Sequence, residues 1–284
     1  MPPNIFHHPT IGDSPLIIRT LILLAIGLLT GTITAMSAGS GVMIVVPLLV
    51  MLSGYSMHEA IGTSLLVDVI ASINVAFNYY RYKRVDLKAG AWLAGAAVIG
   101  AQVGSHIASL IPQTGLKHGF SLFVVISGLI FWIRARSNHK ISLSFLRSKN
   151  PKVQQWIIAG FGFFLGLNTG IFGAGGGVTI LLILIYVLDF PLHMAIGTAT
   201  AIMAVTCASG AIGYTLQGHI PWLDAVIIGL AAMASGLVFA KIANRTSEKT
   251  LNWAVGGIFI FIGIAMTFIG DGELANMVVA ALAR

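Results

Sequence analysis

The chain alternates long apolar runs with short polar or basic stretches. Most of the apolar runs reach the roughly 20 residues that an α-helix needs to cross a bilayer. The runs at 42–52 and 178–189 are about half that long, and each follows a glycine-rich break. We therefore predict about ten membrane segments, five in each half. They lie near residues 16–36, 42–52, 58–80, 87–111, 114–134, 153–171, 178–189, 193–216, 221–243 and 248–270.

The same module is present twice. SAGSGVMIVVPLL (Ser37–Leu49) recurs as GAGGGVTILLILI (Gly173–Ile185), and HEAIGTS (His58–Ser64) recurs as HMAIGTA (His193–Ala199), in the same order. A duplicated apolar module with a glycine-rich break in each copy is typical of secondary transporters built from internal repeats. The first break is Ser37–Gly41, and the second is Gly173–Gly177.

Composition places the chain in a membrane. Hydrophobic residues make up 57% of it and charged residues 9%, against roughly a quarter charged in soluble domains. The net charge of +7 comes from residues between the apolar runs, with no aromatic-interleaved patch, so we expect no nucleic-acid partner. The single cysteine, Cys207, excludes an intrachain disulfide and a cysteine metal cluster. We see no catalytic spacing such as H-E-x-x-H or G-x-S-x-G, and we expect neither an enzyme nor a metal or other cofactor.

The basic residues predict the topology, because cytoplasmic loops retain Lys and Arg. They gather in the loop at 81–88, in the linker at 135–152 and in the loop at 241–249, which ten passes place on one side. Each half then crosses an odd number of times, so the second copy is inverted and both termini lie on the outer side. The divisions are a polar N-terminal segment (1–15), the first repeat (16–134), the basic cytoplasmic linker (135–152), the inverted second repeat (153–270) and a C-terminal tail (271–284). The predicted fold is an all-α, inverted-repeat bundle with two glycine-broken half-helix pairs.

The breaks predict an anion site. Their missing side chains leave backbone N–H groups in hydrocarbon, where each must meet a polar partner. Each break also opens the N-terminus of a short helix, where free N–H groups and the helix dipole favour an anion. Close helix packing is the alternative role for these glycines. Packing alone is our expectation for Gly100 and Gly104, which receive no site.

Polar side chains inside membrane segments are costly and need a reason. Asp68 is the one carboxylate deep in a predicted segment, and four-residue spacing puts it on one helix face with Ser64 and Ser72. It is either a proton-coupling acid or a structural acid, and the second copy has Met203 in its place. Asn168 and Thr169 either line the site or cap the broken helix. The predicted substrate-binding residues are Gly39, Ser40, Gly41, Thr63, Ser64, Asn168, Thr169, Gly175, Gly176, Gly177 and Thr198.

A GxGGG-type break, an apolar half-helix and then H-x-A-I-G-T, all duplicated, resemble the TauE/SafE family of sulfite and organosulfur anion exporters. The second break matches the family pattern well, whereas the first departs from it at Ser37 and Ser40. The resemblance implies a multi-pass protein of the bacterial inner membrane, with periplasmic termini by the topology above. Its lipid-embedded bundle would export sulfite, sulfoacetate or a related sulfonate, with Asp68 as the candidate for proton coupling. A passive small-anion channel is the alternative function, and a homodimer is left open.

Overall fold

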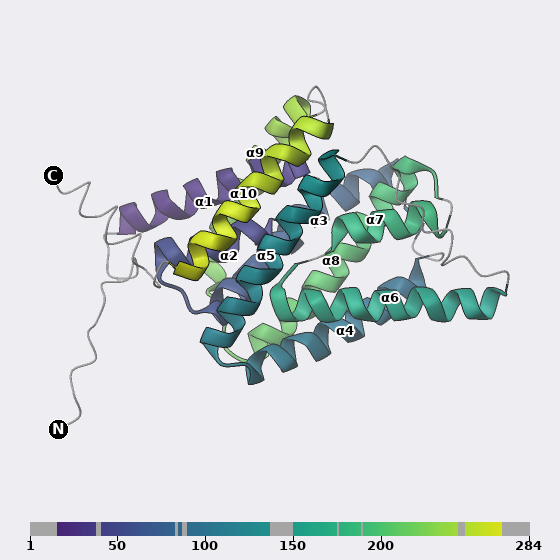
Figure 1. Ribbon diagram of the computed structural model, residues 1–284, viewed down its shortest axis with the longest axis horizontal. Coiled ribbons are helices and arrows are strands. Elements are labelled where there is room, and N and C mark those ends of the chain that lie inside the picture. The colour runs from purple at the N-terminus through teal and green to yellow at the C-terminus, as the bar shows by residue number, and fades with distance from the viewer. Residues whose placement is uncertain are drawn as a thin grey trace.

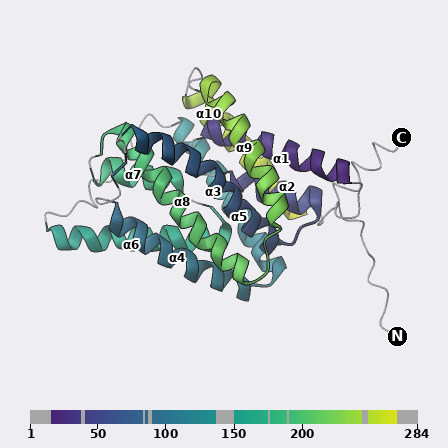
Figure 2. The ribbon, with the colours of Figure 1, turned by 180° about the vertical axis from the view of Figure 1, so that it is seen from behind.

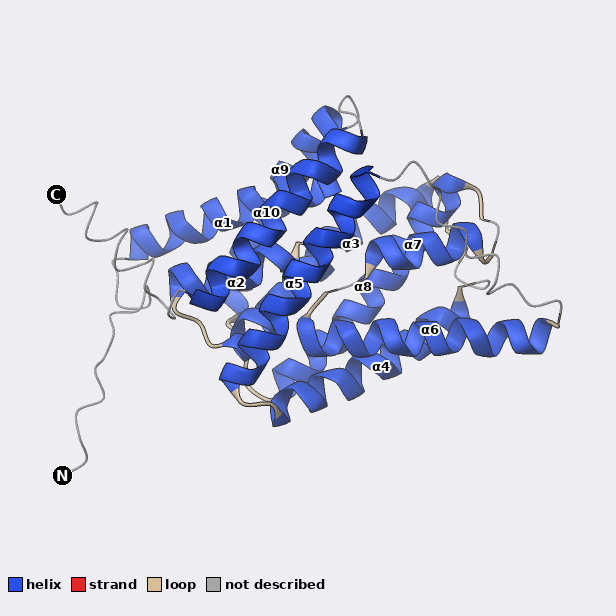
Figure 3. Ribbon diagram, in the orientation of Figure 1, coloured by secondary structure: helices blue, strands red, loops and turns tan. Residues whose placement is uncertain are grey.

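The computed structural model describes residues 16–37, 41–82, 85–86, 90–136, 150–174, 176–188, 190–243 and 248–268. These residues form ten α-helices and no strand (Figures 1 and 3). The helices are α1 (Leu16–Ser37), α2 (Val42–Ser53), α3 (Met57–Arg81), α4 (Ala91–Leu110), α5 (Gln113–Arg136), α6 (Pro151–Phe172), α7 (Gly177–Tyr186), α8 (Leu192–Leu216), α9 (Trp222–Ala243) and α10 (Glu248–Phe268).

Each predicted segment coincides with one helix, and the differences lie at the ends. α4 begins at Ala91 rather than at residue 87, because Gly90 is its N-cap. α7 ends at Tyr186. Val187 is its C-cap, and the chain makes a turn at residues 187 and 188. Hydropathy reports which residues suit lipid, whereas these ends depend on local backbone geometry.

Six of the described helices, α1, α4, α5, α6, α8 and α9, have the length and hydropathy to cross a membrane. α3 is 25 residues long but carries more polar side chains, and α2 is a shorter apolar helix. Large apolar side chains also cover the outside of the bundle, including Phe164, Leu223 and Phe261, which are 66%, 71% and 73% exposed. Such a surface suits lipid rather than water, so the chain is a multi-pass membrane protein.

The helices pack in pairs that repeat when the two halves are exchanged. α4 packs on α6, as α1 packs on α9, and α3 contacts α9, as α8 contacts α4 (Figures 1 and 2). α3 packs on its counterpart α8, and α5 packs on its counterpart α10. Both of these counterpart pairs are antiparallel. Gly62 lies against Tyr214 while Gly210 lies against Leu65, and Gly128 lies against Gly256 while Gly263 lies against Val125.

Glycines let α4 and α6 approach backbone to backbone. A Cβ atom added at Gly100 would overlap the carbonyl oxygen of Phe163, and one at Gly104 would overlap that of Leu167. The glycines of α6 do the same in return, since a Cβ at Gly166 would overlap the carbonyl oxygen of Ala97. The prediction that Gly100 and Gly104 serve packing is therefore confirmed.

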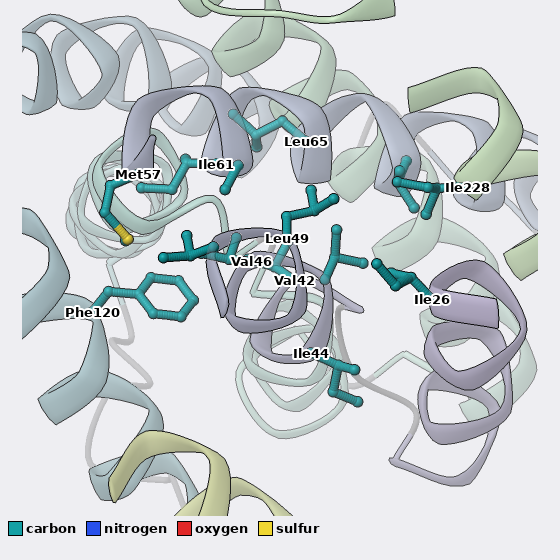
Figure 4. Packing of buried hydrophobic residues seen from close by; sticks show 14 of the residues in the cluster. Ile26, Val42, Ile44, Val46, Leu49, Met57, Ile61, Leu65, Phe120 and Ile228 are labelled. Carbon is teal, nitrogen blue, oxygen red and sulfur yellow. The ribbon is translucent and has the colours of Figure 1, made fainter. Parts of the chain in front are cut away.

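Two apolar cores surround the two short helices. α2 fills the first, where Val42, Val46 and Leu49 lie between side chains of α1, α3, α5 and α9 (Figure 4). α7 fills the second, together with Leu93 of α4 and Ala195 of α8. Both short helices are thus held by packing on several sides, which fixes the positions of their N-termini.

Candidate functional site

The first break brings α2 to the carboxylate of Asp68. Gly41 is the N-cap of α2, and its N–H donates a hydrogen bond to Asp68 Oδ1 over 3.3 Å. Asp68 lies on α3 and is 3% exposed. A carboxylate at a helix N-terminus is favourable because it meets an N–H group that has no partner within the helix and the positive end of the dipole.

Buried hydroxyl groups without a partner lie close to this contact. Thr34 Oγ1 of α1 is one, and it would lie 3.0 Å from a Cβ atom placed on Gly41. Ser72 Oγ, one helical turn beyond Asp68, is another, on a side chain that is 2% exposed. A buried hydroxyl left without a hydrogen bond costs about 1–3 kcal/mol, so these two groups suit a polar ligand. The predicted residues did not include Thr34, although its place one turn from Thr30, just before the break, was a signal.

The second break is capped by its own helix. Gly173 takes the left-handed conformation, with φ of 74°, and its N–H donates to the carbonyl oxygen of Thr169 over 2.7 Å. The Thr169 hydroxyl lies 2.9 Å from the carbonyl oxygen of Leu165 and 2.8 Å from that of Ala174. Of the two predicted roles for Thr169, these contacts favour the cap. Gly176, the N-cap of α7, is also left-handed, with φ of 59°.

The two breaks lie side by side, with α3 against both. A Cβ atom at Gly173 would lie 3.2 Å from Val42 Cγ1, in the first turn of α2, and 3.0 Å from Ser64 Oγ. Asp68, one turn along α3 from Ser64, meets Gly41 of the first break. In the second copy a Cβ at Gly177 would lie 2.8 Å from Met203 Sδ. Asp68 and Met203 therefore occupy matching places beside the N-termini of α2 and α7.

From this meeting point α2 and α7 extend toward opposite ends of the bundle. The end of α2 leads to Tyr55, which contacts Asp224 at the start of α9. α7 instead packs among residues near the starts of α4, α6 and α8, namely Leu93, Ile158 and Ala195. The N-termini of the two short helices thus lie toward the middle of the bundle.

The other predicted residues are placed as follows. Thr198 is buried on α8 beside Gly90, the N-cap of α4, and its hydroxyl accepts a hydrogen bond from the Asp86 N–H over 3.0 Å. Thr63 is buried on α3 with no partner for its hydroxyl, and Asn168 is half-buried on α6. Gly39, Ser40 and Gly175 lie outside the described residues.

A polar cluster that the sequence did not reveal joins the outer ends of three elements. Arg19 Nη2 of α1 lies 2.5 Å from Asp224 Oδ2, in the first turn of α9, and the Tyr55 hydroxyl donates to the same oxygen. Arg19 is also 3.5 Å from the Tyr55 hydroxyl. Burial, and then the bond to Asp224, raise the pKa of Tyr55, so its hydroxyl keeps the proton that it donates. We call these three residues the clamp.

Two histidines stack on each other, and each lies a few residues from a clamp residue in the sequence. The rings of His58, at the start of α3, and His219, between α8 and α9, have centroids 5.3 Å apart. Burial, followed by the electrostatic effect of the neighbouring His58, lowers the pKa of His219 below its ordinary value. Within the described part of the chain no three His, Cys, Asp or Glu side chains gather closely enough to hold a metal ion.

Comparison with known proteins identifies the family. A family model described as sulfite exporter TauE/SafE matches residues 23–266. The chain belongs to the TauE/SafE family. Proteins named probable membrane transporters resemble this TauE/SafE chain over nearly their whole length, which makes it a membrane transporter.

YunE of Bacillus subtilis (strain 168) is 25% identical over 267 residues, which cover 88% of this chain and 98% of YunE. YdhB of the same organism is 25% identical over 241 residues, or 83% of this chain and 93% of YdhB. MJ0441 of Methanocaldococcus jannaschii is 25% identical over 260 residues, or 86% of this chain and 94% of MJ0441. No solved structure matches the chain.

Proposed function

We propose that this TauE/SafE protein exports a small sulfur-containing anion, such as sulfite, sulfoacetate or a related sulfonate, across the bacterial inner membrane. The anion binds between the N-termini of α2 and α7. The observation that carries this proposal is the contact between the two breaks, where Gly173 lies against Val42 and Ser64. Proton coupling through Asp68 is part of the proposal, and the family description supports the choice of anion.

Backbone donors can hold such an anion without a basic side chain. The first N–H groups of a helix have no partner within it, and the helix dipole adds a partial positive charge there. The unpaired hydroxyls of Thr34 and Ser72 supply further donors at the first break. An oxyanion, which accepts several hydrogen bonds at once, suits this arrangement better than a cation does.

The packing supports an inverted repeat as the frame of this site. α3 and α8 are counterparts in the two copies and are antiparallel, as are α5 and α10. With the basic loops on the cytoplasmic side of the membrane, the ten helices form two inverted sets of five, and both termini are periplasmic. Outward and inward exposure of the central site would follow from rocking one half against the other.

The topology has a direct test. After Cys207→Ala, single cysteines introduced at Asn150 and Ala283 should react with a membrane-impermeant thiol reagent from opposite sides of oriented membrane vesicles. Asn150 is exposed, so its substitution disturbs no core packing. Reaction of both cysteines from the same side would contradict the inverted repeat.

The anion site is tested at the second break by Gly176→Val. The added side chain crowds the start of α7, where the anion must approach. It also strains a backbone with positive φ by about 1–2 kcal/mol. We expect sulfite and sulfoacetate affinity, measured by titration calorimetry on purified protein, to fall at least tenfold.

Gly218→Val is the matched control. Gly218 also has positive φ, 77°, and a Cβ there meets nothing within 4 Å. It therefore carries the same backbone strain without crowding a break, and we expect normal anion affinity with a similar loss of thermal stability. If Gly176→Val binds as well as Gly218→Val does, the breaks serve packing and the anion site lies elsewhere.

A further inference from the structure

The first break already holds a carboxyl group, and that group belongs to the protein. The Asp68 carboxylate accepts the hydrogen bond of the Gly41 N–H, which is a donor that the proposed function assigns to the substrate. Asp68 is almost fully buried on α3, with the unpaired hydroxyl of Ser72 one turn beyond it and that of Thr34 beside Gly41. The site therefore has donors for an oxyanion and one resident carboxyl group among them.

We propose that Asp68 and the transported anion compete for the N-terminus of α2, so that the anion binds when Asp68 is protonated and the proton crosses the membrane together with the anion. This inference rests on the proposed function, because it concerns the same site. It goes further by fixing the order of events and the direction of the proton. An acid that merely accompanied transport would not have to leave the helix N-terminus, whereas Asp68 occupies it.

Competition follows from charge and geometry. Two negative charges cannot share the same N–H donors in a region of low dielectric, where like charges repel strongly. Protonation removes the charge of Asp68 and weakens its hold on the Gly41 N–H, because a hydrogen bond to an ionised acceptor is the stronger one. The incoming anion then meets a helix N-terminus without a competing charge.

The titratable groups around Asp68 are few. α8 presents Cys207, which is fully buried and within electrostatic range of Asp68, and Tyr214 two turns farther on. α2 carries no titratable side chain, and those of α1, α5 and α9 lie near the ends of these helices. Asp68 is therefore the group whose proton can be exchanged at the first break, with Cys207 as the neighbour to control for.

The second break has no such competitor. Met203 takes the place of Asp68 beside Gly177, and its thioether carries no charge. One half of the site thus responds to protons and the other does not, which sets one proton for each anion. An anion of charge −2 then leaves the cell as a unit of net charge −1, and the inside-negative membrane potential drives it outward.

A binding titration separates this inference from the proposed function. The probe is sulfoacetate, titrated onto purified protein from about pH 6 to about pH 9, where an ordinary carboxylate stays ionised. We expect wild-type affinity to weaken by up to about tenfold for each pH unit, the limit for one linked proton. Asp68→Asn should bind with the affinity that wild type has at low pH and show no pH dependence. Cys207→Ala should keep the wild-type slope.

Transport gives a second measurement, in which wild type is compared with Asp68→Asn. In proteoliposomes loaded with sulfoacetate and a pH-sensitive dye, with the membrane potential clamped, efflux through wild type should make the lumen more alkaline. Efflux through Asp68→Asn should leave the lumen pH unchanged. If Asp68→Asn does not fold, Asp68→Glu takes its place and should keep the pH slope with a shifted midpoint.

The possible results test the proposed function and the competition separately. Failure of wild type to bind sulfoacetate or sulfite at any pH would overturn the proposed function, and this inference with it. Normal binding without a pH slope, a slope that persists in Asp68→Asn, or a lumen that acidifies during efflux would overturn the competition and leave the proposed function standing.

Discussion

Gly166→Val is expected to lower the yield of folded protein severely, because it forces α4 and α6 apart. A Cβ atom at Gly166 would overlap the carbonyl oxygen of Ala97, which is backbone and cannot turn aside. Overpacking typically costs about 1–3 kcal/mol and occasionally more. Here the obstacle is backbone, and the neighbouring glycines Gly100, Gly104, Gly162 and Gly170 show that the whole contact is equally close. The measurement is the yield of monodisperse protein in detergent, followed by the thermal unfolding midpoint of what remains.

Gly160→Val is the matched control on the same helix. Gly160 lies in α6, and a Cβ there meets nothing within 4 Å. The two substitutions change helix propensity equally, so any difference between them reports the contact with α4. We expect Gly160→Val to yield nearly normal amounts of folded protein. Equal yields and equal midpoints for the two variants would show that α4 and α6 are not packed at Gly166.

Much of the helix pattern can be predicted from the sequence because lipid imposes it. Every backbone group in hydrocarbon must be paired within its own helix, so each crossing leaves a long apolar run. The same constraint makes the two breaks visible, since glycines that interrupt such a run, as at Gly173–Gly177, need another explanation. Duplication strengthens the signal because the second copy repeats it at matching positions.

The contacts that the site residues make could not be predicted from the sequence. The spacing of Ser64, Asp68 and Ser72 predicts one helix face, and the structure places that face against both breaks. The sequence does not say that Ser64 meets the second break while Asp68 meets the first. That choice depends on how α3 is turned against the two breaks, which is set by packing across the whole bundle. The Thr169 hydroxyl, similarly, is used by the cap because Gly173 turns the chain back toward it.

The clamp is the clearest example of a cluster that the sequence does not predict. Arg19, Tyr55 and Asp224 come from elements that are far apart in sequence, and each has an ordinary role when considered alone. Arg19 reads as a residue at the membrane rim, and Asp224 as an acidic residue in the first turn of a helix, where the dipole favours it. Parallel packing of α1 on α9 brings Arg19 to Asp224, and the end of α2 brings Tyr55 to both.

Arg19→Leu should be the most destabilising substitution in the clamp. It leaves the carboxylate of Asp224, which is 2% exposed, without its cationic partner. Breaking a buried ion pair from one side costs about 3–5 kcal/mol. Because the Arg19 side chain is 33% exposed, water screens part of the interaction, and we expect about 2–3 kcal/mol. Unfolding by heat or denaturant in detergent measures the loss.

The double variant Arg19→Leu with Asp224→Leu completes the test. Replacing both partners by apolar side chains removes the uncompensated charge of Asp224, so the double variant should be more stable than Arg19→Leu. The gain is reduced because the Tyr55 hydroxyl loses its acceptor. Asp224→Asn, which keeps an acceptor for Tyr55, should fall between wild type and Arg19→Leu. If Arg19→Leu unfolds at the wild-type midpoint, the ion pair contributes nothing measurable. The outer end of α2 would then be held by the apolar packing around Leu49 and Met57 rather than by the clamp.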